Sequence, residues 1–460
     1  MTPLLKGCTP WPEEFVDRYW AAGHWRGNTL DNLLRDWALE YGPRTALVHG
    51  DTRITYAHLN RSVNRMAAAF RMRGLRPGQR VVVQLPNVPE RVITVFALMR
   101  AGAVPVLCPL SYREPQVPGI VRITQAIGYV GPPTHQGFDH TAMAGRIAAQ
   151  WPFLRRVFTL DEPGTSSPYG GLTTDPSGCQ YSPLGSLDSP PGLALALSAD
   201  QVALFLLSTG AAEVPRLIPR THNDSAYQAR AAAESVALTA NDVYLAALSP
   251  DSPVAFAGPG VVGALATGAT VVLVDDPEPA TCLAVIARER VTVAAVEASG
   301  AGAWLDVLPA FQADLSSLRS VHLVGADPLP EAAGRLGAEL GCRLERILAM
   351  PEGLLLLTRP DDPEEAVLST HGRPLSPDDE IRIVDAEGKE VPDGEPGALL
   401  VRGPYTVRGY YRAPDENVRS FTADGRFRTG FLASRNPDGT LALLGRAAEF
   451  PVVPQGPADR

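Results

Sequence analysis

Lysine is nearly absent from this chain of 460 residues, because only Lys6 and Lys389 occur among its 41 basic side chains and the rest are arginine. The 50 acidic side chains leave a formal net charge of −9 at pH 7. An acidic protein repels phosphate backbones, so nucleic acid is not an expected partner. A mechanism that requires a catalytic lysine has these two candidates only.

Long hydrophobic runs and a leader segment are missing as well. The apolar runs at 202–207 and 354–357 are far shorter than the roughly 18 residues that cross a bilayer. The first residues contain no continuous apolar stretch, and Glu13 and Glu14 follow soon after, which argues against a secretory signal. We therefore expect a cytoplasmic protein without a membrane partner.

The sequence also lacks cysteine pairs and clusters of metal ligands. The five cysteines are scattered, form no C-x-x-C pair and have no histidine at metal-binding spacing, which argues against a disulfide framework and a zinc site. What is present is 45% hydrophobic and 20% charged residues, the composition of a globular protein of enzyme size. At about 150 residues per domain, the length predicts two to four structural units.

Short β-rich runs alternate with longer helical stretches from residue 43 onward, which is typical of an α/β fold. Runs at 45–48 and 54–56 flank the turn Gly50-Asp51 and predict a hairpin, and a helix is expected over 57–73. The segments expected next are strands at 81–85, 104–107, 202–207, 243–247, 271–274, 291–296 and 321–324, with helices at 91–100 and 225–236 among them.

Four units are expected in chain order. Residues 1–190 form a first α/β subdomain, and the Gly-, Pro-, Ser- and Thr-rich stretch 161–192 is a linker or surface loop at its end. Residues 193–371 form a second α/β subdomain, and residues 372–450, with short strands and tight turns, form a small β-rich, barrel-like unit. The Pro-rich tail at 451–460 is expected to be frayed.

The most informative segment runs from Leu206 to His222 and reads LLSTGAAEVPRLIPRTH. Small and hydroxylated residues after a buried strand, closed by the cation of Arg216, are typical of a loop whose backbone N–H groups bind phosphate. The order of a Walker loop is absent. The segment resembles the phosphate loop of adenylate-forming enzymes, typically S-G-G-T-T-G-L-P-K, and LIPRTHND at 217–224 resembles the aryl-acid AMP ligases that activate dihydroxybenzoate or salicylate for siderophore assembly.

The resemblance extends over nearly the whole chain. It includes WPEEFVDR at 11–18, YLAAL at 244–248, TRPDDPEE at 358–365 and RGPYTVRGYY at 402–411. It implies the large N-terminal region of an adenylate-forming enzyme, with two layered α/β subdomains and a small β-rich unit. The cofactors that it implies, if activity is retained, are ATP and Mg²⁺.

The phosphate loop departs from the family pattern. The loop begins with Ser208, Thr209 and Gly210, of which Ser208 and Gly210 match the pattern. Ala211 and Ala212 stand at the two threonine positions, Glu213 replaces a glycine and Arg216 replaces the lysine. The carboxylate repels ATP phosphates, and the lost hydroxyls remove two donors. An ordinary strand-to-loop turn is the competing interpretation.

The ribose-binding motif T-G-D reads Thr429-Gly430-Phe431, and the hinge motif G-R-x-x-D includes Arg446 and ends in Glu449. In the family, the aspartate accepts hydrogen bonds from both ribose hydroxyls, and each bond to a charged group contributes about 1.5–3 kcal/mol. Phe431 accepts neither, so we expect weak nucleotide binding. Stacking of Phe431 on adenine is the alternative.

The metal-binding motif G-M-A-E-G reads AMPEG at 349–353 and keeps Glu352. A carboxylate oxygen suits Mg²⁺, although Pro351 removes a backbone N–H just before it. A solvated or helix-capping glutamate is the alternative.

Arg216 and His222 are weak catalytic candidates, and a structural histidine is the alternative for His222.

The acid pocket lacks the family's polar contacts. After YLAAL, the gate histidine falls on Ser252, the carboxylate-binding asparagine on Pro253 and the pocket serine on Gly258. The V-G-G-A loop becomes Val324-Gly325-Ala326-Asp327, whose added carboxylate opposes an anionic acid. A dihydroxybenzoate pocket is therefore not expected.

The sequence ends shortly after Arg446, where the family continues with a small C-terminal domain that carries the adenylation lysine. We expect that domain to be absent. Lys6 lies in the N-terminal arm and Lys389 in a turn between expected strands, so neither is expected to replace the family's lysine.

These features predict a truncated, degraded homologue of an aryl-acid AMP ligase that adenylates poorly or not at all. It is expected to act by binding, as the partner of a carrier protein or of an active ligase paralogue in a nonribosomal-peptide or siderophore-like pathway, or as a sensor of a small carboxylic acid. Phe431 and Phe450 are then expected to be partly exposed at a bare docking face or to cover that face. The alternative is an active ATP-dependent ligase for an acid other than dihydroxybenzoate, completed by a separate C-terminal domain.

Overall fold

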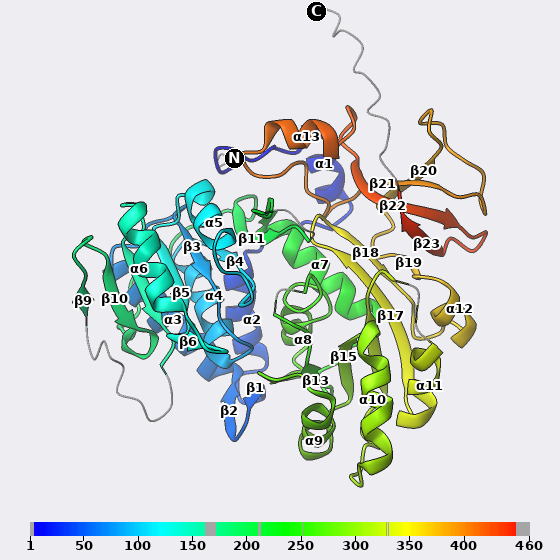
Figure 1. The fold of residues 1–460 in the computed structure, drawn as a ribbon, viewed down its shortest axis with the longest axis horizontal. Helices are drawn as coiled ribbons and strands as arrows, with labels where there is room; N and C mark the ends of the chain where they lie inside the picture. The colour runs from blue at the N-terminus through cyan, green and yellow to red at the C-terminus, as the bar shows by residue number, and fades with distance from the viewer. Residues whose placement is uncertain are drawn as a thin grey trace, which may run out of the picture.

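In the computed structural model, two large mixed sheets lie side by side with helices packed on their faces, and a small antiparallel sheet lies at one end (Figure 1). The structure describes residues 4–161, 172–209, 213–250, 252–327, 329 and 331–447. The predictions that fall outside these ranges concern Gly210, Ala211, Ala212, Glu449, Phe450, the stretch 162–171 and the tail 451–460. The α/β class with a smaller β-rich unit is confirmed.

The first large sheet has eight strands. Their order is β12 (Leu217–Thr221), β11 (Val202–Leu207), β4 (Val104–Leu107), β3 (Arg80–Val83), β5 (Gly128–Gly131), β8 (Arg156–Thr159), β10 (Gln180–Pro183) and β9 (Thr173–Thr174). The strands from β11 to β10 are parallel, while β12 and β9 are antiparallel edges. Val81, Val82 and Val83 of β3 are all buried, as a parallel strand covered on both faces requires.

Part of this sheet lies where the sequence predicted an irregular linker. Strand β10 falls within 161–192 and pairs with β8, for example Tyr181 with Val157. The side chains of Cys179 and Tyr181 are buried. The prediction was wrong for this stretch, because backbone hydrogen bonds to an existing sheet edge hold a short strand that its own composition does not favour.

The second large sheet has nine strands. Their order is β19 (Arg373–Pro374), β18 (Leu354–Leu357), β17 (Arg343–Met350), β16 (Ser320–Val324), β15 (Val293–Glu297), β13 (Val243–Ala246), β14 (Thr270–Leu273), β1 (Thr45–His49) and β2 (Thr52–Thr55). The strands from β17 to β1 are parallel, and β1 and β2 form the predicted hairpin.

The small sheet is antiparallel and forms the β-rich unit. Its strands are β20 (Glu380–Val384), β21 (Gly397–Arg402), β22 (Phe427–Arg435) and β23 (Leu441–Arg446), in that order. A separate short hairpin joins β6 (Thr134–His135) and β7 (Phe138–Asp139).

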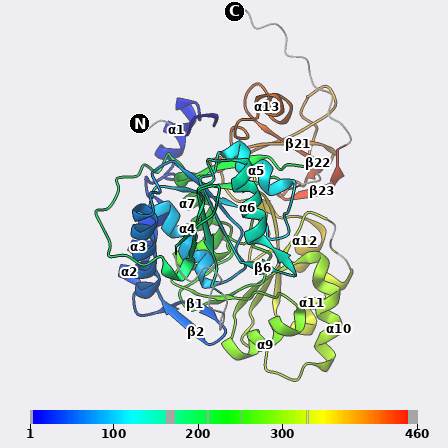
Figure 2. The ribbon, with the colours of Figure 1, turned by 60° about the vertical axis from the view of Figure 1, so that its left-hand side comes forward.

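The described helices pack mainly on the two large sheets, although the last one contacts β22 of the small sheet. They are α1 (Glu13–Ala21), α2 (Leu30–Glu40), α3 (Tyr56–Met72), α4 (Pro89–Arg100), α5 (Gln116–Thr124), α6 (His140–Gln150), α7 (His222–Ser235), α8 (Val261–Ala266), α9 (Pro279–Glu289), α10 (Ala301–Val307), α11 (Glu331–Leu340), α12 (Glu364–Ser369) and α13 (Pro414–Ser420). Figure 2 shows α9, α10 and α11 at the end of the molecule away from α13 and the small sheet. None of the described helices has the length and hydropathy that crossing a bilayer requires.

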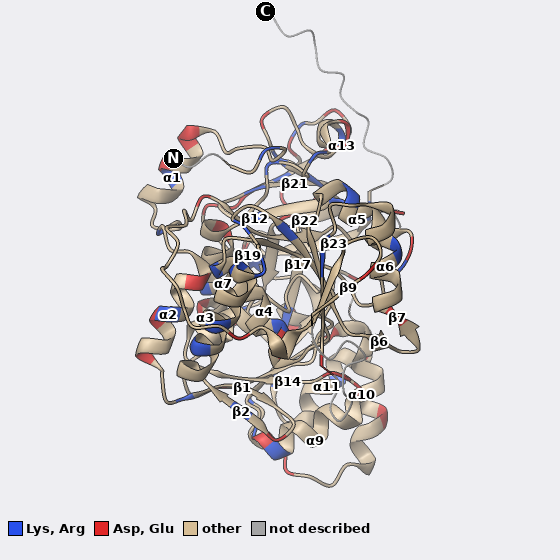
Figure 3. Cartoon of the chain, turned by 90° about the vertical axis from the view of Figure 1, so that its left-hand side faces the viewer, with Lys and Arg blue, Asp and Glu red and all other residues tan. Residues whose placement is uncertain are grey.

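The largest apolar core lies between the two large sheets. Helix α4 contacts β4 of one sheet and β1 of the other, so side chains on nearly every face of this helix are buried. Phe70, Phe96 and Leu265, from α3, α4 and α8, belong to this core. Basic and acidic residues are interspersed over the described elements in the view of Figure 3, which agrees with the modest net charge.

The two large sheets do not coincide with the two α/β subdomains expected from the sequence. Strands β11 and β12, from the region 193–371, complete the first sheet, while β1 and β2, from the region 1–190, complete the second. The pairing joins Phe205 with Val106 and Leu47 with Val271. The two α/β regions therefore exchange strands, and the boundaries expected at 190 and 371 stay a prediction.

Candidate functional site

The loop between β11 and β12 carries the candidate phosphate-binding residues. Beyond the last strand pair, the Ser208 N–H donates to the carbonyl oxygen of Arg216 at 2.9 Å, and the Arg216 N–H donates to Ser208 Oγ at 3.0 Å. Ser208 is buried, whereas Thr209 and Glu213 are exposed. The base of the loop is therefore fixed by two reciprocal hydrogen bonds.

Arg216 points from this loop toward helix α13. Its Nη2 lies 2.7 Å from Glu416 Oε1, and its guanidinium carbon lies 5.4 Å from the centre of the Tyr410 ring. Burial raises the pKa of Glu416, but the hydrogen bonds from Arg419 and the charge of Arg216 outweigh it and hold the pKa below its ordinary value. Because 39% of the Arg216 side chain is exposed, a phosphate oxygen can compete with Glu416 for this cation.

Glu352 lies in a tight turn between β17 and β18. Gly353 follows it with a φ of 108°, and a Cβ at Gly353 would lie 2.0 Å from the carbonyl oxygen of Tyr405, so only glycine fits there. The Glu352 side chain is buried, and Oε1 accepts a hydrogen bond of 2.9 Å from the Tyr410 hydroxyl. The solvated glutamate considered from the sequence is thus wrong, since this carboxylate points inward.

Burial and neighbouring charges act in opposite directions on the pKa of the Glu352 carboxyl group. Burial raises the pKa of its carboxyl group, while the hydrogen bond from Tyr410 and the charges of Arg216 and Arg220 act in the opposite direction. Mg²⁺ is commonly held by one or two carboxylates together with substrate phosphates and water. Glu352 fits that role beside a nucleotide. No cluster of three or more His, Cys, Asp or Glu side chains occurs among the described residues, so a metal cage made by protein alone is absent there.

A buried arginine forms a hydrogen bond with the turn that carries Glu352. Arg220 of β12 donates to Asp224 Oδ1 at 2.8 Å, to Gln228 Oε1 at 2.7 Å and to the Pro351 carbonyl oxygen at 3.3 Å. Asp224 also belongs to the capping box of α7 with the N-cap residue Thr221. The start of α7 and the turn that presents Glu352 are thereby held in one hydrogen-bonded unit.

The position of the ribose-binding motif is filled by an aromatic ring. Gly430 has a φ of 72°, and Phe431 follows it on β22 with 7% of its surface exposed. The guanidinium carbon of Arg446 lies 4.1 Å from the centre of the Phe431 ring. Phe431 belongs to an apolar cluster with Ile218 and Leu348. The residues present do not fit a ribose, because no acceptor stands where the aspartate of the motif would be.

Two predictions about Phe431 are corrected by this arrangement. The residue was expected to be partly exposed at a bare docking face or to cover that face; the exposure is wrong, because its ring is buried in the apolar cluster beneath the small sheet. Stacking on adenine was the alternative for Phe431, but Arg446 already covers the ring face.

The candidate acid cavity lies where the two large sheets meet. It opens between the ends of β4 and β11, the loop after β13 and the turn before Glu352. Its lining residues are Leu107, Pro109, Tyr112, Leu206, Leu207, Ser208, Thr209, Pro250, Ser252, Pro253, Phe256, Ala257 and Pro351. The cavity therefore joins the phosphate loop, through Ser208 and Thr209, to the turn that carries Glu352, and no charged side chain lines it among the described residues.

Only part of the predicted acid pocket lines this cavity. Ser252 and Pro253 do, as predicted. Gly258 is packed against the backbone of Val254 instead, with room for no more than a hydrogen. Gly325 and Ala326 lie in the loop after β16, outside the lining residues, where the Gly325 N–H donates to the carbonyl oxygen of Ile347.

The carboxylate predicted to oppose an anionic acid does not reach the cavity either. Asp327 is exposed, and its carbonyl oxygen accepts a hydrogen bond of 2.6 Å from Arg346. The prediction was wrong because the loop after β16 turns the Asp327 side chain to solvent, away from the lining residues.

His222 and the two lysines have structural or surface positions. His222 is buried at the start of α7, and its Nδ1 accepts the N–H of Leu30 at 3.2 Å. Burial lowers the pKa of His222 to about 4, so the ring is neutral at pH 7 and the structural alternative holds. Lys389 is exposed in the turn after β20, as predicted, and Lys6 lies in the arm before α1.

Three aromatic residues of the site were not predicted from the sequence: Tyr410, Tyr112 and Phe256. Tyr410 binds Glu352 and faces Arg216, while Tyr112 and Phe256 line the acid cavity. Tyr410 does lie in the segment RGPYTVRGYY that carries the resemblance, and this was the available signal. Nothing in the local sequence of Tyr112 or Phe256 distinguishes them from core aromatics.

Comparison with known proteins agrees with this geometry. A family model described as AMP-binding enzyme matches residues 34–411. The 2,3-dihydroxybenzoate-AMP ligase of Bacillus subtilis is 38% identical over 97% of this chain and 80% of its own length. The salicyl-AMP ligase / salicyl-S-ArCP synthetase of Mycobacterium tuberculosis is 39% identical over 97% of this chain and 78% of its own. The apo structure of Mycobacterium smegmatis MbtA has a TM-score of 0.87 and 38% identity, over 98% of this chain and 81% of that one.

Proposed function

The chain belongs to the family of AMP-binding enzymes, and from this premise we propose that it is an ATP-dependent ligase that joins a carboxylic acid to AMP. The observation that carries the proposal is the cavity that connects Ser208 and Thr209 to the turn of Glu352. Relatives that are 38% and 39% identical over 97% of the chain are named as AMP ligases. These names favour the active-ligase alternative over the degraded homologue that was the first expectation.

The proposed reaction is a nucleotidyl transfer. A carboxylate oxygen of the acid attacks the α-phosphorus of ATP, a new P–O bond forms, and the bond from that phosphorus to the pyrophosphate oxygen breaks. The hydroxyl groups of Ser208 and Thr209 are placed to donate to phosphate oxygens at one end of the cavity. Arg216 supplies a cation near the same loop once Glu416 is displaced. Glu352 would hold Mg²⁺, which neutralises phosphate charge when bound.

The lining of the cavity supports an acid with an apolar body. Proline, leucine, alanine and aromatic side chains form most of its wall, and Ser208, Thr209 and Ser252 supply the hydroxyl groups. A pair of neighbouring hydroxyls, as in 2,3-dihydroxybenzoate, needs fixed polar partners, and a buried polar group without one costs about 1–3 kcal/mol. We therefore propose an unsubstituted aryl or aliphatic acid as substrate.

The acyl group is expected to pass from AMP to a thiol. One relative carries the name salicyl-S-ArCP synthetase, and by analogy we propose a carrier protein as the partner of this chain. We place the reaction in the cytoplasm, where ATP is available and the five free cysteines stay reduced.

Binding without adenylation is the second candidate. It is favoured by one specific observation, the Phe431 ring under Arg446 at the position where the family binds ribose. In that case, the acid cavity would still take a carboxylic acid, and the protein would act as a sensor or as the partner of an active ligase.

Exchange between ATP and labelled pyrophosphate separates the two candidates. The purified chain is assayed with Mg²⁺ and benzoate, phenylacetate, hexanoate, salicylate or 2,3-dihydroxybenzoate, and the Glu352→Gln variant is the matched control. Exchange that depends on benzoate, phenylacetate or hexanoate and falls in the variant supports the ligase. Calorimetric binding of an acid without exchange, in the presence of saturating ATP, supports the second candidate.

A further inference from the structure

A second cavity lies under the N-terminal arm. Its volume of about 390 Å³ is the size of a site for a small organic molecule. One wall comes from residues 4–25, and the other from the start of β11, β12, the start of α7 and the segment after β21. The cavity shares no lining residue with the acid cavity, so it is a separate site.

The wall of this second cavity is mainly apolar. Trp11 and Val16 line it from the arm, and Val202 and Pro219 line it from the sheet. Trp25, of which 4% is exposed, also contributes. Indole and aliphatic groups on opposite sides favour a ligand with a flat or branched apolar body, because such a body removes apolar surface from water on both faces.

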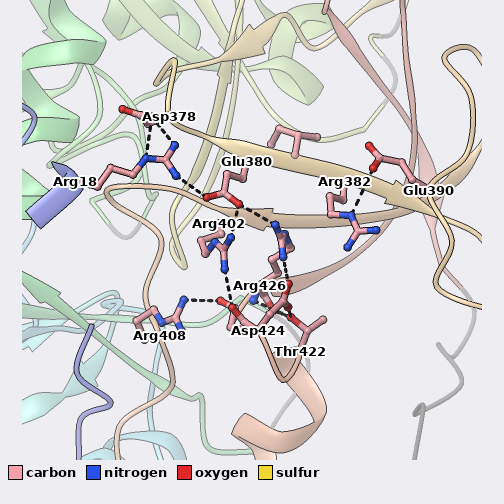
Figure 4. Close-up of polar contacts among 12 residues, drawn as sticks. Arg18, Asp378, Glu380, Arg382, Glu390, Arg402, Arg408, Thr422, Asp424 and Arg426 are labelled. Atoms are coloured by element: carbon pink, nitrogen blue, oxygen red, sulfur yellow. Dashed lines mark hydrogen bonds and ion pairs between the residues drawn. The ribbon is translucent and has the colours of Figure 1, made fainter. Parts of the chain in front are cut away.

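The arm is held firmly enough to keep the cavity open. Arg18 of α1 forms ion pairs with Asp378 at 2.5 Å and with Glu380 at 3.0 Å (Figure 4). The Trp25 indole N–H donates to the carbonyl oxygen of Pro404 at 2.9 Å. These contacts fix the C-terminal half of α1 and the segment after it beside the small sheet, so a ligand would enter a preformed site with little ordering of this part of the wall.

The charges that line the cavity are mostly negative. Arg408 is its only basic lining residue in the described part of the chain, and its guanidinium carbon lies 5.0 Å from the centre of the Trp11 ring. Asp224 is paired with Arg220 at 2.8 Å. Asp200 and Glu13 form no ion pair within the described residues.

Asp200 is the better placed of these two carboxylates. Its Oδ1 accepts a hydrogen bond of 2.8 Å from Asn223, which fixes the carboxylate at the cavity wall, while Oδ2 has, among the described residues, only a contact of 3.5 Å with the Ser198 hydroxyl. A cation at Oδ2 would gain a charge-assisted hydrogen bond that the protein itself does not supply.

We propose that this cavity binds a small organic cation, an amine with an aryl or branched alkyl body, whose ammonium group lies at Asp200 and whose apolar body lies between Trp11 and Val202. The ammonium group donates to Asp200 Oδ2, and Glu13 adds a second negative charge at the mouth. The site does not depend on the proposed ligase activity, since no residue of the acid cavity or of the Glu352 turn takes part.

The test uses 2-phenylethylamine as the probe and 2-phenylethanol as its neutral analogue, with binding to the full chain measured by calorimetry. The Asp200→Asn variant keeps the acceptor for Asn223 and removes the charge. We expect saturable binding of the amine, a Kd that rises at least about tenfold in Asp200→Asn, and no change for 2-phenylethanol. Asp306→Asn, on the exposed side of α10, is the control and should leave the amine's Kd unchanged.

A second variant and a competition experiment test the proposal further. Glu13→Gln, at an exposed position, should weaken the amine in the same direction with a smaller factor, which guards against misfolding of the first variant. Benzoate in excess should not displace the amine. Absence of saturable binding at millimolar amine, equal Kd values in the native chain and Asp200→Asn, or displacement by benzoate would overturn the proposal.

Discussion

The guanidinium carbon of Arg446 lies 4.1 Å from the centre of the Phe431 ring, and the two residues are direct partners across strands β22 and β23. The pair occupies the position that the sequence motif T-G-D assigns to ribose binding. An apolar ring gives a nucleotide no acceptor there, so under the proposed function we expect the affinity for ATP to depend on the phosphate end of the site. The first prediction follows from this pair.

Replacing Phe431 by aspartate should tighten ATP binding. The Phe431→Asp carboxylate would accept hydrogen bonds from the ribose hydroxyls and pair with Arg446 when no nucleotide is bound. Each such bond contributes about 1.5–3 kcal/mol, so the KM for ATP in pyrophosphate exchange should fall at least about tenfold. Phe431→Leu, which stays apolar, is the control, and equal KM values in the two variants would contradict the ribose interpretation.

Replacing Glu352 by glutamine should reduce exchange without unfolding the protein. The amide oxygen can still accept the hydrogen bond from Tyr410, but the negative charge that favours Mg²⁺ is lost. We expect kcat to fall by at least about tenfold. The midpoint of urea unfolding should stay equal or rise, because burial raises the pKa of the native carboxyl group and an amide carries no such penalty. Native-like exchange in Glu352→Gln would remove Glu352 from the site.

The turn that presents Glu352 should not tolerate a side chain after it. In Gly353→Ala, the new Cβ would meet the Tyr405 carbonyl oxygen at 2.0 Å at a φ of 108°. Gly388→Ala is the matched control, since Gly388 has a φ of 79° and open space around it. The control should lose about 1–2 kcal/mol, and Gly353→Ala should lose at least about 2 kcal/mol more in urea unfolding. Equal losses would show that the close approach is relieved elsewhere.

The free energy of unfolding should fall as the pH drops below about 6.5, partly through His371. Burial and the charge of Arg346 lower the pKa of His371 from 6.5 to about 4. Its Nδ1 accepts the N–H of Leu443 at 3.1 Å, so protonation there breaks a buried hydrogen bond. A lowered pKa means that the unfolded chain binds the proton first, so the stabilisation is complete above pH 6.5 and is lost between pH 6.5 and 4.

His371→Asn isolates this contribution, because the amide oxygen can replace the Nδ1 acceptor without titrating. The difference in unfolding free energy between pH 7 and pH 5 should be smaller in the variant than in the native chain. His140 and His222, whose pKa values are also lowered to about 4 by burial, remain as titrating groups in both. An unchanged difference would assign the acid sensitivity to titrating groups other than His371.

Local patterns in the sequence predicted much of the secondary structure. The helix predicted over 57–73 from its hydrophobic period corresponds to α3 (Tyr56–Met72), and the strand predicted from the apolar run at 202–207 corresponds to β11. Strand β12 was not predicted, because Pro219 and Arg220 break its pattern, yet the fold buries Arg220 against Asp224. The sequence also could not predict which strands share a sheet, since pairs such as Leu47 with Val271 join residues that are far apart in the chain.

The candidate site was predicted best where it rests on contiguous motifs. Ser208, Ser252 and Pro253 do line one cavity, and the motif around Glu352 does present a buried carboxylate. The hydrogen bond between Tyr410 and Glu352 joins residues on separate elements, so no local pattern could reveal it. Phe431 was expected at a bare face because it lies close to the end of the sequence, whereas its apolar partners Ile218 and Leu348 come from the two large sheets.

The proposed ligase activity is tested most directly by the fate of the acid's oxygen. An apolar acid such as benzoate, labelled with ¹⁸O in both carboxylate positions, is incubated with ATP, Mg²⁺ and the full chain, and the product is trapped with hydroxylamine. The account predicts AMP that carries one ¹⁸O atom, because a carboxylate oxygen attacks the α-phosphorus and stays on it when the acyl group leaves. Unlabelled AMP, or no AMP with any acid of the panel, would contradict the assignment of this chain as a carboxylate–AMP ligase.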